Sequence, residues 1–185
     1  MNNKITKAKN ISKKLNIVFF GTMSAGKSTF INALIGSELL PMGNGATTTI
    51  HTTIEHDARR KSSYASCYSD SFTCIARSEN INSRVILDWS CKSEVKKINI
   101  KTRFKGGSDV ARNWVLHDTP GPNNSQTSLH SERAFQALTS TSCDTLCYLL
   151  NATQIGINDD LHTLQKIQKI LTSSYNIRII FILNK

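Results

Sequence analysis

Residues 15–29 read LNIVFFGTMSAGKST, and this stretch decides the fold of the chain. It opens with an apolar run of strand length, Leu15–Phe20, and continues as G-x-x-x-x-G-K-S, the pattern of a phosphate-binding loop. Gly21 and Gly26 let the backbone approach an anion closely, and successive N–H groups can surround its oxygens. Helical spacing of the next apolar residues predicts a helix over Ser28–Ile35, with its N-terminus directed at the same anion. The stretch therefore predicts a strand, a P-loop and a helix, in that order.

The side chains of this loop indicate a nucleotide site with Mg²⁺. Lys27 can reach the β- and γ-phosphates, and the Ser28 hydroxyl can ligate Mg²⁺. A second motif, Asp118-Thr119-Pro120-Gly121, follows the apolar candidate strand Trp114–His117. An Asp at the carboxyl end of a strand lies where open α/β sheets bind ligands. Its carboxylate can hold Mg²⁺ through water, and the N–H of Gly121 can face a γ-phosphate.

Two further elements extend the nucleotide-site hypothesis. The loop over residues 37–49 ends in Thr47, Thr48 and Thr49, and any one of them could close over Mg²⁺ and the attacking water. Asn184-Lys185 follows an apolar strand and begins the pattern N-K-x-D, whose Asp accepts hydrogen bonds from guanine. The chain stops at Lys185, so these residues only suggest guanine specificity.

The remaining apolar patterns predict an α/β fold. Strands that alternate with helices imply βαβ units and a mostly parallel sheet with helices on both faces, the architecture of a P-loop NTPase. Ile50–His56 and Ser63–Tyr68 are expected to pair with each other across the polar turn DARRK. Further strands are expected at Val95–Phe104, Thr145–Leu150 and Ile177–Leu183, and helices at Val85–Trp89, Leu129–Leu138 and Asn158–Leu171. In the last helix we expect one buried stripe, formed by Leu161, Leu164, Ile167 and Leu171.

Composition restricts the class of protein. The 185 residues suffice for one α/β domain, and no apolar run approaches the roughly 20 residues that span a bilayer. Five cysteines without C-x-x-C spacing predict reduced thiols in the cytosol. The net charge is +10, and residues 59–105 carry eleven Lys and Arg against four Asp and Glu. Such a surface attracts nucleotides, nucleic acid or anionic lipid without distinguishing them, and a solvated surface with no dedicated ligand is the simpler interpretation.

Together these motifs resemble the GTPase domain of the dynamin superfamily, and especially that of the bacterial dynamin-like proteins. The P-loop has Ser24-Ala25 before Gly26-Lys27-Ser28, where translation and ribosome-assembly GTPases usually have Val-Gly-Lys. The resemblance covers most of residues 15–185, while residues 57–112 match weakly and look like a lineage-specific insertion. Other matching stretches are INALIGSELLP (Ile31–Pro41), HDTPGPNNSQ (His117–Gln126) and DTLCYLLNATQ (Asp144–Gln154).

The resemblance implies a site for GTP and Mg²⁺. Counted from Pro41, the switch threonine of the family falls on Thr48. The implied ligands of Mg²⁺ are Ser28, Thr48 and Asp118. The residues implied in hydrolysis are Ser24, Lys27, Thr48 and Gly121. The implied nucleotide contacts come from Gly21, Ser24, Ala25, Gly26, Lys27, Ser28, Thr29, Asp118, Gly121, Asn184 and Lys185.

The chain also departs from the family pattern. Many dynamins have Gln just before the Ser-Ala-Gly-Lys stretch, where it helps to organise the catalytic water, and this chain has Met23. The guanine-binding Asp, the later base-binding loop, and the stalk and membrane-binding parts of such proteins do not occur within these 185 residues. We therefore expect a basic flexible lead-in over residues 1–14 and a GTPase domain over 15–185 that is incomplete at its C-terminus. Such an N-terminal fragment would expose apolar sheet surface.

Three functions are compatible with the sequence. The first is a cytoplasmic dynamin-type GTPase that pairs its GTPase domains and acts on or near anionic membranes through regions outside this chain. The second is a ribosome- or RNA-associated GTPase, suggested by the basic surface. Ser24-Ala25 and the absence of a recognisable RNA-binding fold argue against a specific nucleic-acid partner. The third is a non-catalytic remnant that binds nucleotide weakly or not at all, suggested by the stop at Lys185.

Overall fold

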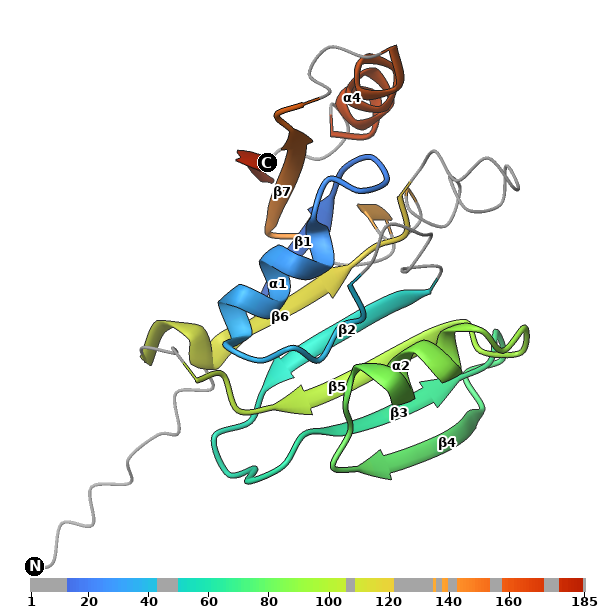
Figure 1. Ribbon diagram of the computed structural model, residues 1–185. Coiled ribbons are helices and arrows are strands. Elements are labelled where there is room, and N and C mark those ends of the chain that lie inside the picture. The colour runs from blue at the N-terminus through green and yellow to red at the C-terminus, as the bar shows by residue number, and fades with distance from the viewer. Residues whose placement is uncertain are drawn as a thin grey trace, which may run out of the picture.

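A computed structural model of the chain describes residues 13–42, 50–105, 109–121, 135, 138–139, 143–153, 158–171 and 177–184 (Figure 1). Within these ranges eight strands form one sheet, in the order β4-β3-β5-β2-β6-β1-β7-β8. The helices are α1 (Lys27–Ile35), α2 (Ser83–Ser90), α4 (Asn158–Leu171) and the 3₁₀ helix η1 (Asp109–Asn113). The strands are β1 (Leu15–Phe20), β2 (His51–His56), β3 (Tyr64–Tyr68), β4 (Cys74–Glu79), β5 (Lys97–Thr102), β6 (Trp114–Asp118), β7 (Thr145–Asn151) and β8 (Arg178–Asn184).

One half of the sheet is parallel and centres on β1. This strand lies between β6 and β7 and pairs in parallel with both, and β7 pairs in parallel with β8. Parallel strands end at the same edge of a sheet, so the loop after β1 and the motif after β6 emerge side by side. Their register places Phe19 opposite Asp118. The prediction of an α/β fold with a large, mostly parallel sheet is confirmed.

The other half of the sheet corrects one expectation. β2 and β3 do not pair with each other, because β5 lies between them, parallel to β2 and antiparallel to β3. Asn99 of β5 is the partner of both Thr53 and Ser66. The other edge of β2 pairs antiparallel with β6, so both edges of this strand are already occupied. β4, an edge strand paired antiparallel with β3, was not predicted, because its sequence CIARSE lacks a sustained apolar pattern.

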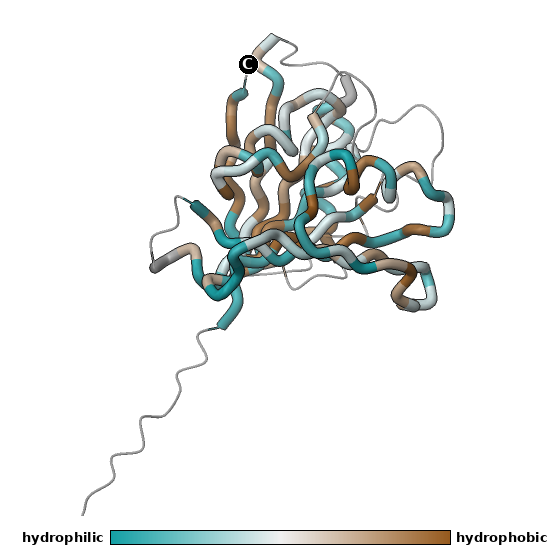
Figure 2. The backbone as a smooth tube through the Cα atoms, turned by 60° about the horizontal axis from the view of Figure 1, so that its bottom comes forward, coloured by the Kyte–Doolittle hydropathy of each residue, from teal (hydrophilic) through white to brown (hydrophobic). Residues whose placement is uncertain are grey.

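Helices cover both faces of the sheet, and each face has its own apolar core. Alternate residues of the strands point to opposite faces, so Phe19 packs on the α1 and α2 side while Phe20 packs on the α4 side. Figure 2 shows hydrophobic segments running through the strands in the middle of the molecule. All five cysteines are free thiols. Burial raises the pKa of Cys143 and Cys147 to about 11, as expected for thiols that pack as small apolar groups.

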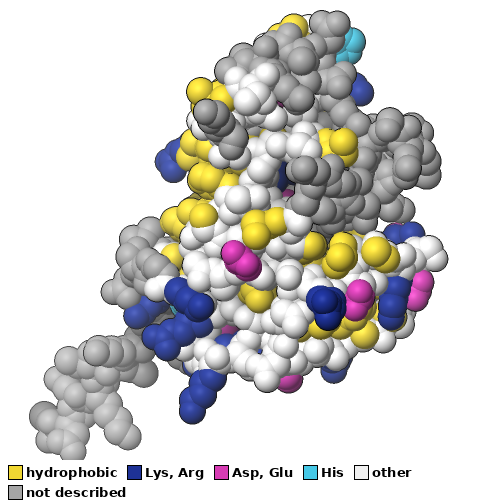
Figure 3. All heavy atoms as spheres, in the orientation of Figure 1, with side chains coloured by type: hydrophobic (Ala, Val, Ile, Leu, Met, Phe, Trp, Pro, Cys, Tyr) yellow, Lys and Arg dark blue, Asp and Glu magenta, His cyan; other side chains and the backbone are white. Residues whose placement is uncertain are grey.

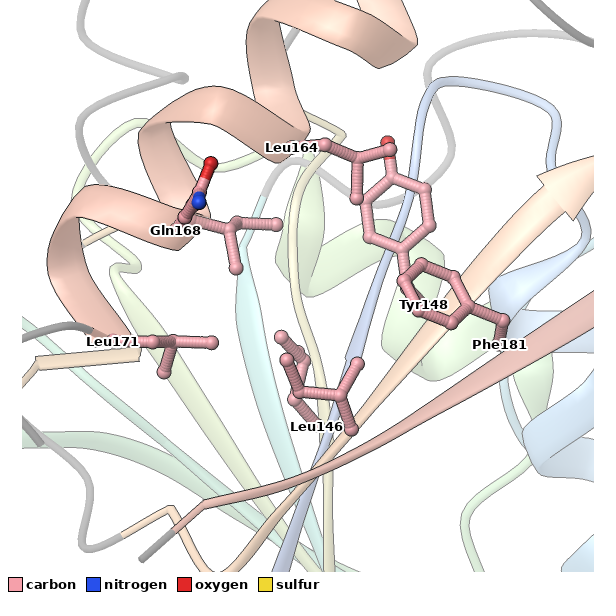
Figure 4. Close-up of a pocket in the computed structure, with 8 residues that line it drawn as sticks. Leu146, Tyr148, Leu164, Gln168, Leu171 and Phe181 are labelled. Atoms are coloured by element: carbon pink, nitrogen blue, oxygen red, sulfur yellow. The ribbon is translucent and has the colours of Figure 1, made fainter. Parts of the chain in front are cut away.

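The edge strand β8 exposes several apolar side chains, in line with the exposed apolar sheet surface expected above. Phe181 is 56% exposed and Leu183 is 63% exposed. A groove of about 400 Å³ runs between this strand and α4, where Phe181 and Leu146 of the sheet lie across from Leu164 and Leu171 of the helix (Figure 4). The expected helical stripe is therefore only partly correct. Ile167 is buried at 3% exposure, but Leu161 is 52% exposed and does not join it.

Two of the expected segments lie wholly or mostly outside the described ranges. These are the lead-in over residues 1–14, except for Lys13 and Lys14, and most of the helix expected at Leu129–Leu138. No helix within the described ranges is long and apolar enough to cross a bilayer. The segment 57–112 forms β3, β4, α2 and β5, whose strands belong to the same sheet as β1.

Candidate functional site

The loop between β1 and α1 contains three residues with positive φ. Gly21 and Gly26 have φ values of 149° and 84°, and Ser24 has a φ of 61°. A Cβ at position 21 would collide with the carbonyl oxygen of Leu149 in β7, so the loop lies close against that strand. Ala25 is buried, while Ser24 and Thr29 are exposed. The loop therefore leads directly into the N-terminus of α1, where unpaired N–H groups favour an anion.

Lys27, the first residue of α1, is held back against its own loop. Its ammonium donates hydrogen bonds to the carbonyl oxygens of Gly21, at 2.9 Å, and Thr22, at 3.0 Å. The side chain is buried, and loss of solvent lowers its pKa, while the nearby Asp118 charge opposes that shift. A buried ammonium gains more from an approaching anion than an exposed one does, because little water screens the attraction.

Ser28 and Asp118 meet across the edge of the sheet. The Ser28 hydroxyl donates a hydrogen bond of 2.9 Å to Oδ2 of Asp118, and both residues are buried. Asp118 is the last residue of β6, and Ser28 is in the first turn of α1, so the parallel pairing of β1 and β6 brings them together. A hydroxyl beside a carboxylate, next to a phosphate loop, is a set of hard oxygen donors that suits Mg²⁺.

Thr119 positions this carboxylate and was not identified from the sequence. Its hydroxyl donates a 2.7 Å hydrogen bond to the carbonyl oxygen of Phe19, and the residue is fully buried. The bond ties the chain leaving β6 to the end of β1, beside the point where the P-loop begins. Gly121 lies against the same loop, and a Cβ there would approach the backbone nitrogen of Met23 to 3.2 Å. The two sequence motifs are therefore adjacent in space, as predicted.

Asn184 reaches the P-loop from β8. Its side-chain amide donates a 3.1 Å hydrogen bond to the carbonyl oxygen of Ala25, and a Cβ at Gly26 would collide with that amide. Asn184 thus lies beside the loop, at the edge of the sheet to which β1 and β6 also point. Lys185, like Thr47, Thr48 and Thr49, lies outside the described residues.

Asn32 controls the path into the threonine loop and was also missed. Its Oδ1 accepts hydrogen bonds from the N–H groups of Leu39 and Leu40, and its Nδ2 donates to the carbonyl oxygen of Leu40 at 2.8 Å. One buried side chain of α1 therefore holds the segment that leads toward Thr48. A polar residue within INALIGSELLP does not by itself reveal this role, because its burial and its partners appear only in the folded structure.

Two histidines that looked scattered in the sequence meet behind the site. Nε2 of His51 lies 3.1 Å from Nδ1 of His117, and Nε2 of His117 lies 3.1 Å from Oδ1 of Asn16. Burial is the first cause that lowers the pKa of His51 to about 3 and that of His117 to about 4, and the Lys97 charge adds to both shifts. Neutral imidazoles at these positions link β2, β6 and β1 rather than act as a base on a phosphate.

Comparison with known proteins identifies the family. The family model described as "Dynamin family" matches residues 17–185. The clamp-binding protein CrfC of Escherichia coli K12 is 44% identical over 61 residues, which are 33% of this chain and 8% of that protein. The chain therefore spans a small part of the curated relative it matches.

Solved structures show the same fold. A bacterial dynamin, from a structure described as an oligomerised dynamin pair that senses and tethers membranes, matches with a TM-score of 0.62 and 17% identity. The match covers 94% of this chain and 26% of that one. Era, in a complex with MgGDPNP and a segment of 16S ribosomal RNA, matches with a TM-score of 0.51 and 16% identity over 94% of this chain and 41% of its own. By its P-loop, its fold and its family match, the chain belongs to the dynamin family and resembles the GTPase domains of the bacterial dynamin-like proteins.

Proposed function

We propose that this chain binds GTP with Mg²⁺ and hydrolyses it, as the nucleotide-dependent part of a dynamin-like protein. The observation that carries the proposal is the 2.9 Å hydrogen bond between Ser28 and Asp118, formed next to the buried ammonium of Lys27. These groups provide a positive charge for phosphates and hard oxygens for a cation at one edge of the sheet. The family match supports the same reaction.

Different residues of the chain bind the phosphates and the cation. Backbone N–H groups from Ala25 to Ser28 and the ammonium of Lys27 hold the phosphates, since phosphoryl transfer depends on positioning and charge rather than on a strong base. Ser28 and Thr48 would hold Mg²⁺ directly and Asp118 through water. When bound, the ion neutralises charge on the β- and γ-phosphates. Asn184 holds the P-loop backbone at Ala25, on the side where a base would lie.

We extend the proposal to membrane association and to pairing of GTPase domains. The matched bacterial dynamin is described as an oligomer that tethers membranes, so we propose that the full protein associates with membranes and pairs its GTPase domains. The basic surface leaves the RNA-associated alternative as the second candidate. Sedimentation with anionic vesicles in the presence of GTP tests the first, and retention on RNA tests the second.

Nucleotide titration of Lys27→Ala tests the proposal at its centre. Loss of the ammonium should nearly abolish GTP binding and phosphate release, because no other described cation lies in the loop. Lys92→Ala, at an exposed position in the turn after α2, provides the control and should bind like the unchanged chain. Equal affinity of the Lys27→Ala variant and the control would show that the P-loop does not bind the nucleotide.

A further inference from the structure

A second cation-lined cavity lies outside the nucleotide site. It has a volume of about 570 Å³ and is lined by Arg60, Lys61, Arg103 and Lys105, together with four hydroxyl side chains that include Ser37. No acidic and no aromatic side chain appears in this lining, which consists of described residues only. A water molecule takes about 30 Å³ in the liquid, so the cavity has room for a phosphate ester with ordered water around it.

Three of the four cations that line this cavity form no ion pair within the described residues. Lys61, Arg103 and Lys105 form no ion pair with any residue in the described ranges. Arg60 differs, because its guanidinium pairs with Glu79 at 2.7 Å, its Nε lies 3.9 Å from Oδ2 of Asp57, and it stacks over the ring of Tyr64. These three side chains are exposed, so water weakens their mutual repulsion, and an anion between them would be attracted by all three.

Two buried hydrogen-bond donors also favour a bound anion in this cavity. Oγ of Ser37 and Nε of Arg60 are shielded from solvent and have no hydrogen-bond partner among the described residues. Both residues line this cavity. A buried donor without a partner destabilises the fold, so such groups in a native protein call for an explanation. A ligand with several oxygen atoms would provide hydrogen-bond acceptors for both donors.

The cavity lies at the edge of the sheet opposite the P-loop. β5 runs parallel to β2, which runs antiparallel to β6 and hence to β1, so β5 ends at the edge of the sheet where β1 starts. α1 connects the two edges. It begins at the P-loop and ends at Gly36, where the N–H of Lys105 donates to the carbonyl oxygen of Ile35 at 2.9 Å. In Figure 3, Lys and Arg side chains gather at the lower left of the molecule, over this edge.

We propose that this cavity binds a phosphate monoester, carried either by a small soluble molecule or by a lipid headgroup. A doubly charged monoester has oxygens for the three free cations and for the hydroxyl and guanidinium donors. Nucleic acid fits less well, because no aromatic side chain lines the cavity to stack on a base. The proposal does not depend on nucleotide hydrolysis, since none of the lining residues belongs to the P-loop.

Titration with glycerol 3-phosphate tests the site in the whole 185-residue chain, with GDP added in excess to occupy the P-loop. Lys61→Gln/Arg103→Gln/Lys105→Gln removes three charges from the cavity and should weaken binding at least about tenfold. The control variant Arg84→Gln/Lys92→Gln/Lys166→Gln also removes three positive charges, but from exposed positions outside the cavity. It should leave the affinity unchanged. Arg103→Gln alone, with thermal unfolding as the folding check, gives a smaller loss in the same direction.

The two sources of the phosphate are separated with vesicles. Retention on phosphatidylcholine vesicles that contain phosphatidic acid, lost in the cavity variant and kept in the control, identifies the headgroup as the ligand. Binding of glycerol 3-phosphate without vesicle retention identifies a soluble ester. The proposal is overturned if the unchanged chain binds neither probe, or if both triple variants lose binding equally, since net charge alone would then explain the attraction.

Discussion

The side-chain amide of Asn184 donates a hydrogen bond of 3.1 Å to the carbonyl oxygen of Ala25, and so joins the end of β8 to the P-loop. The contact passes directly over Gly26, where a Cβ would collide with the amide. The glycine is therefore required for two separate reasons. Its φ of 84° disfavours any other residue, and the side-chain amide of Asn184 already fills the space above it.

Gly26→Ala should lose most of its nucleotide affinity and about 1–2 kcal/mol of unfolding free energy, because alanine strains the left-handed backbone and displaces Asn184. Urea denaturation and GTP titration measure the two effects. Gly36→Ala is the matched control, since this glycine also has a positive φ, 71°, at the other end of α1. It should show similar destabilisation with nucleotide affinity intact. Loss of nucleotide affinity in both variants would mean that α1 alone, and not the contact with Asn184, determines binding.

Asp118→Asn should make nucleotide binding nearly insensitive to Mg²⁺. The amide keeps the size of the carboxylate and an acceptor for the Ser28 hydroxyl, but it removes the charge that attracts the cation. We expect the gain in GTP affinity on adding Mg²⁺ to fall at least about tenfold, as for the loss of one charged partner. Asp88→Asn, at an exposed position on α2, should keep the full Mg²⁺ response. If chelation of Mg²⁺ leaves the affinity of the unchanged chain as it was, the metal assignment is wrong.

Met23→Gln should raise the rate of GTP hydrolysis severalfold with little change in GTP affinity. Met23 is 42% exposed and its backbone lies against Gly121, so its side chain is at the mouth of the candidate site. A thioether cannot orient a water molecule as an amide can. Phosphate release under single-turnover conditions measures the effect, and Leu161→Gln, an exposed apolar residue on α4, is the control. An unchanged rate would show that position 23 does not face the attacking water.

His51 should make the fold less stable in acid. Burial lowers the pKa of its imidazole to about 3 from an ordinary value of 6.5, so the unfolded chain takes up a proton at a higher pH than the folded one. Stability is therefore present above about pH 6.5 and declines as the pH falls toward 3, by at most about 1.4 kcal/mol per pH unit for this group.

Urea denaturation between pH 4 and pH 8 tests this dependence. His51→Gln removes the titrating group, and its stability should depend less steeply on pH than that of the unchanged chain. His162→Gln, at an exposed position of α4, should retain the original slope. Identical slopes for His51→Gln and the unchanged chain would show that the pair of histidines is already accessible to protons in the folded state.

The sequence predicted the parallel half of the fold because its signals are local. The apolar run before Gly21 and the one before Asp118 are both buried strands, and parallel pairing brings their loops together without further information. The contacts made by Thr119 and Asn32 could not be predicted in the same way. Each depends on which backbone group lies opposite a polar side chain after folding.

In the other half of the sheet, the strands were recognised but their pairing was predicted wrongly. Ile50–His56 and Ser63–Tyr68 were recognised as strands, but a short polar turn between two strands favours a hairpin, and nothing local reveals that β5 separates them. The apolar run of β8 alone would predict a strand covered on both faces, and exposed apolar sheet surface was expected only from the comparison with the family. Phe181 of this edge strand is 56% exposed.

The place of β5 between β2 and β3 has a consequence for how the chain folds. The β3–β4 hairpin has neighbouring partners and can form as soon as both strands exist, whereas β2 must wait for β5 and β6, which are made much later. During that interval β2 and β3 each have an open edge that another chain could occupy. This half of the sheet therefore closes only when β5 pairs with both β2 and β3, and a slower pairing leaves these edges open to aggregation for longer.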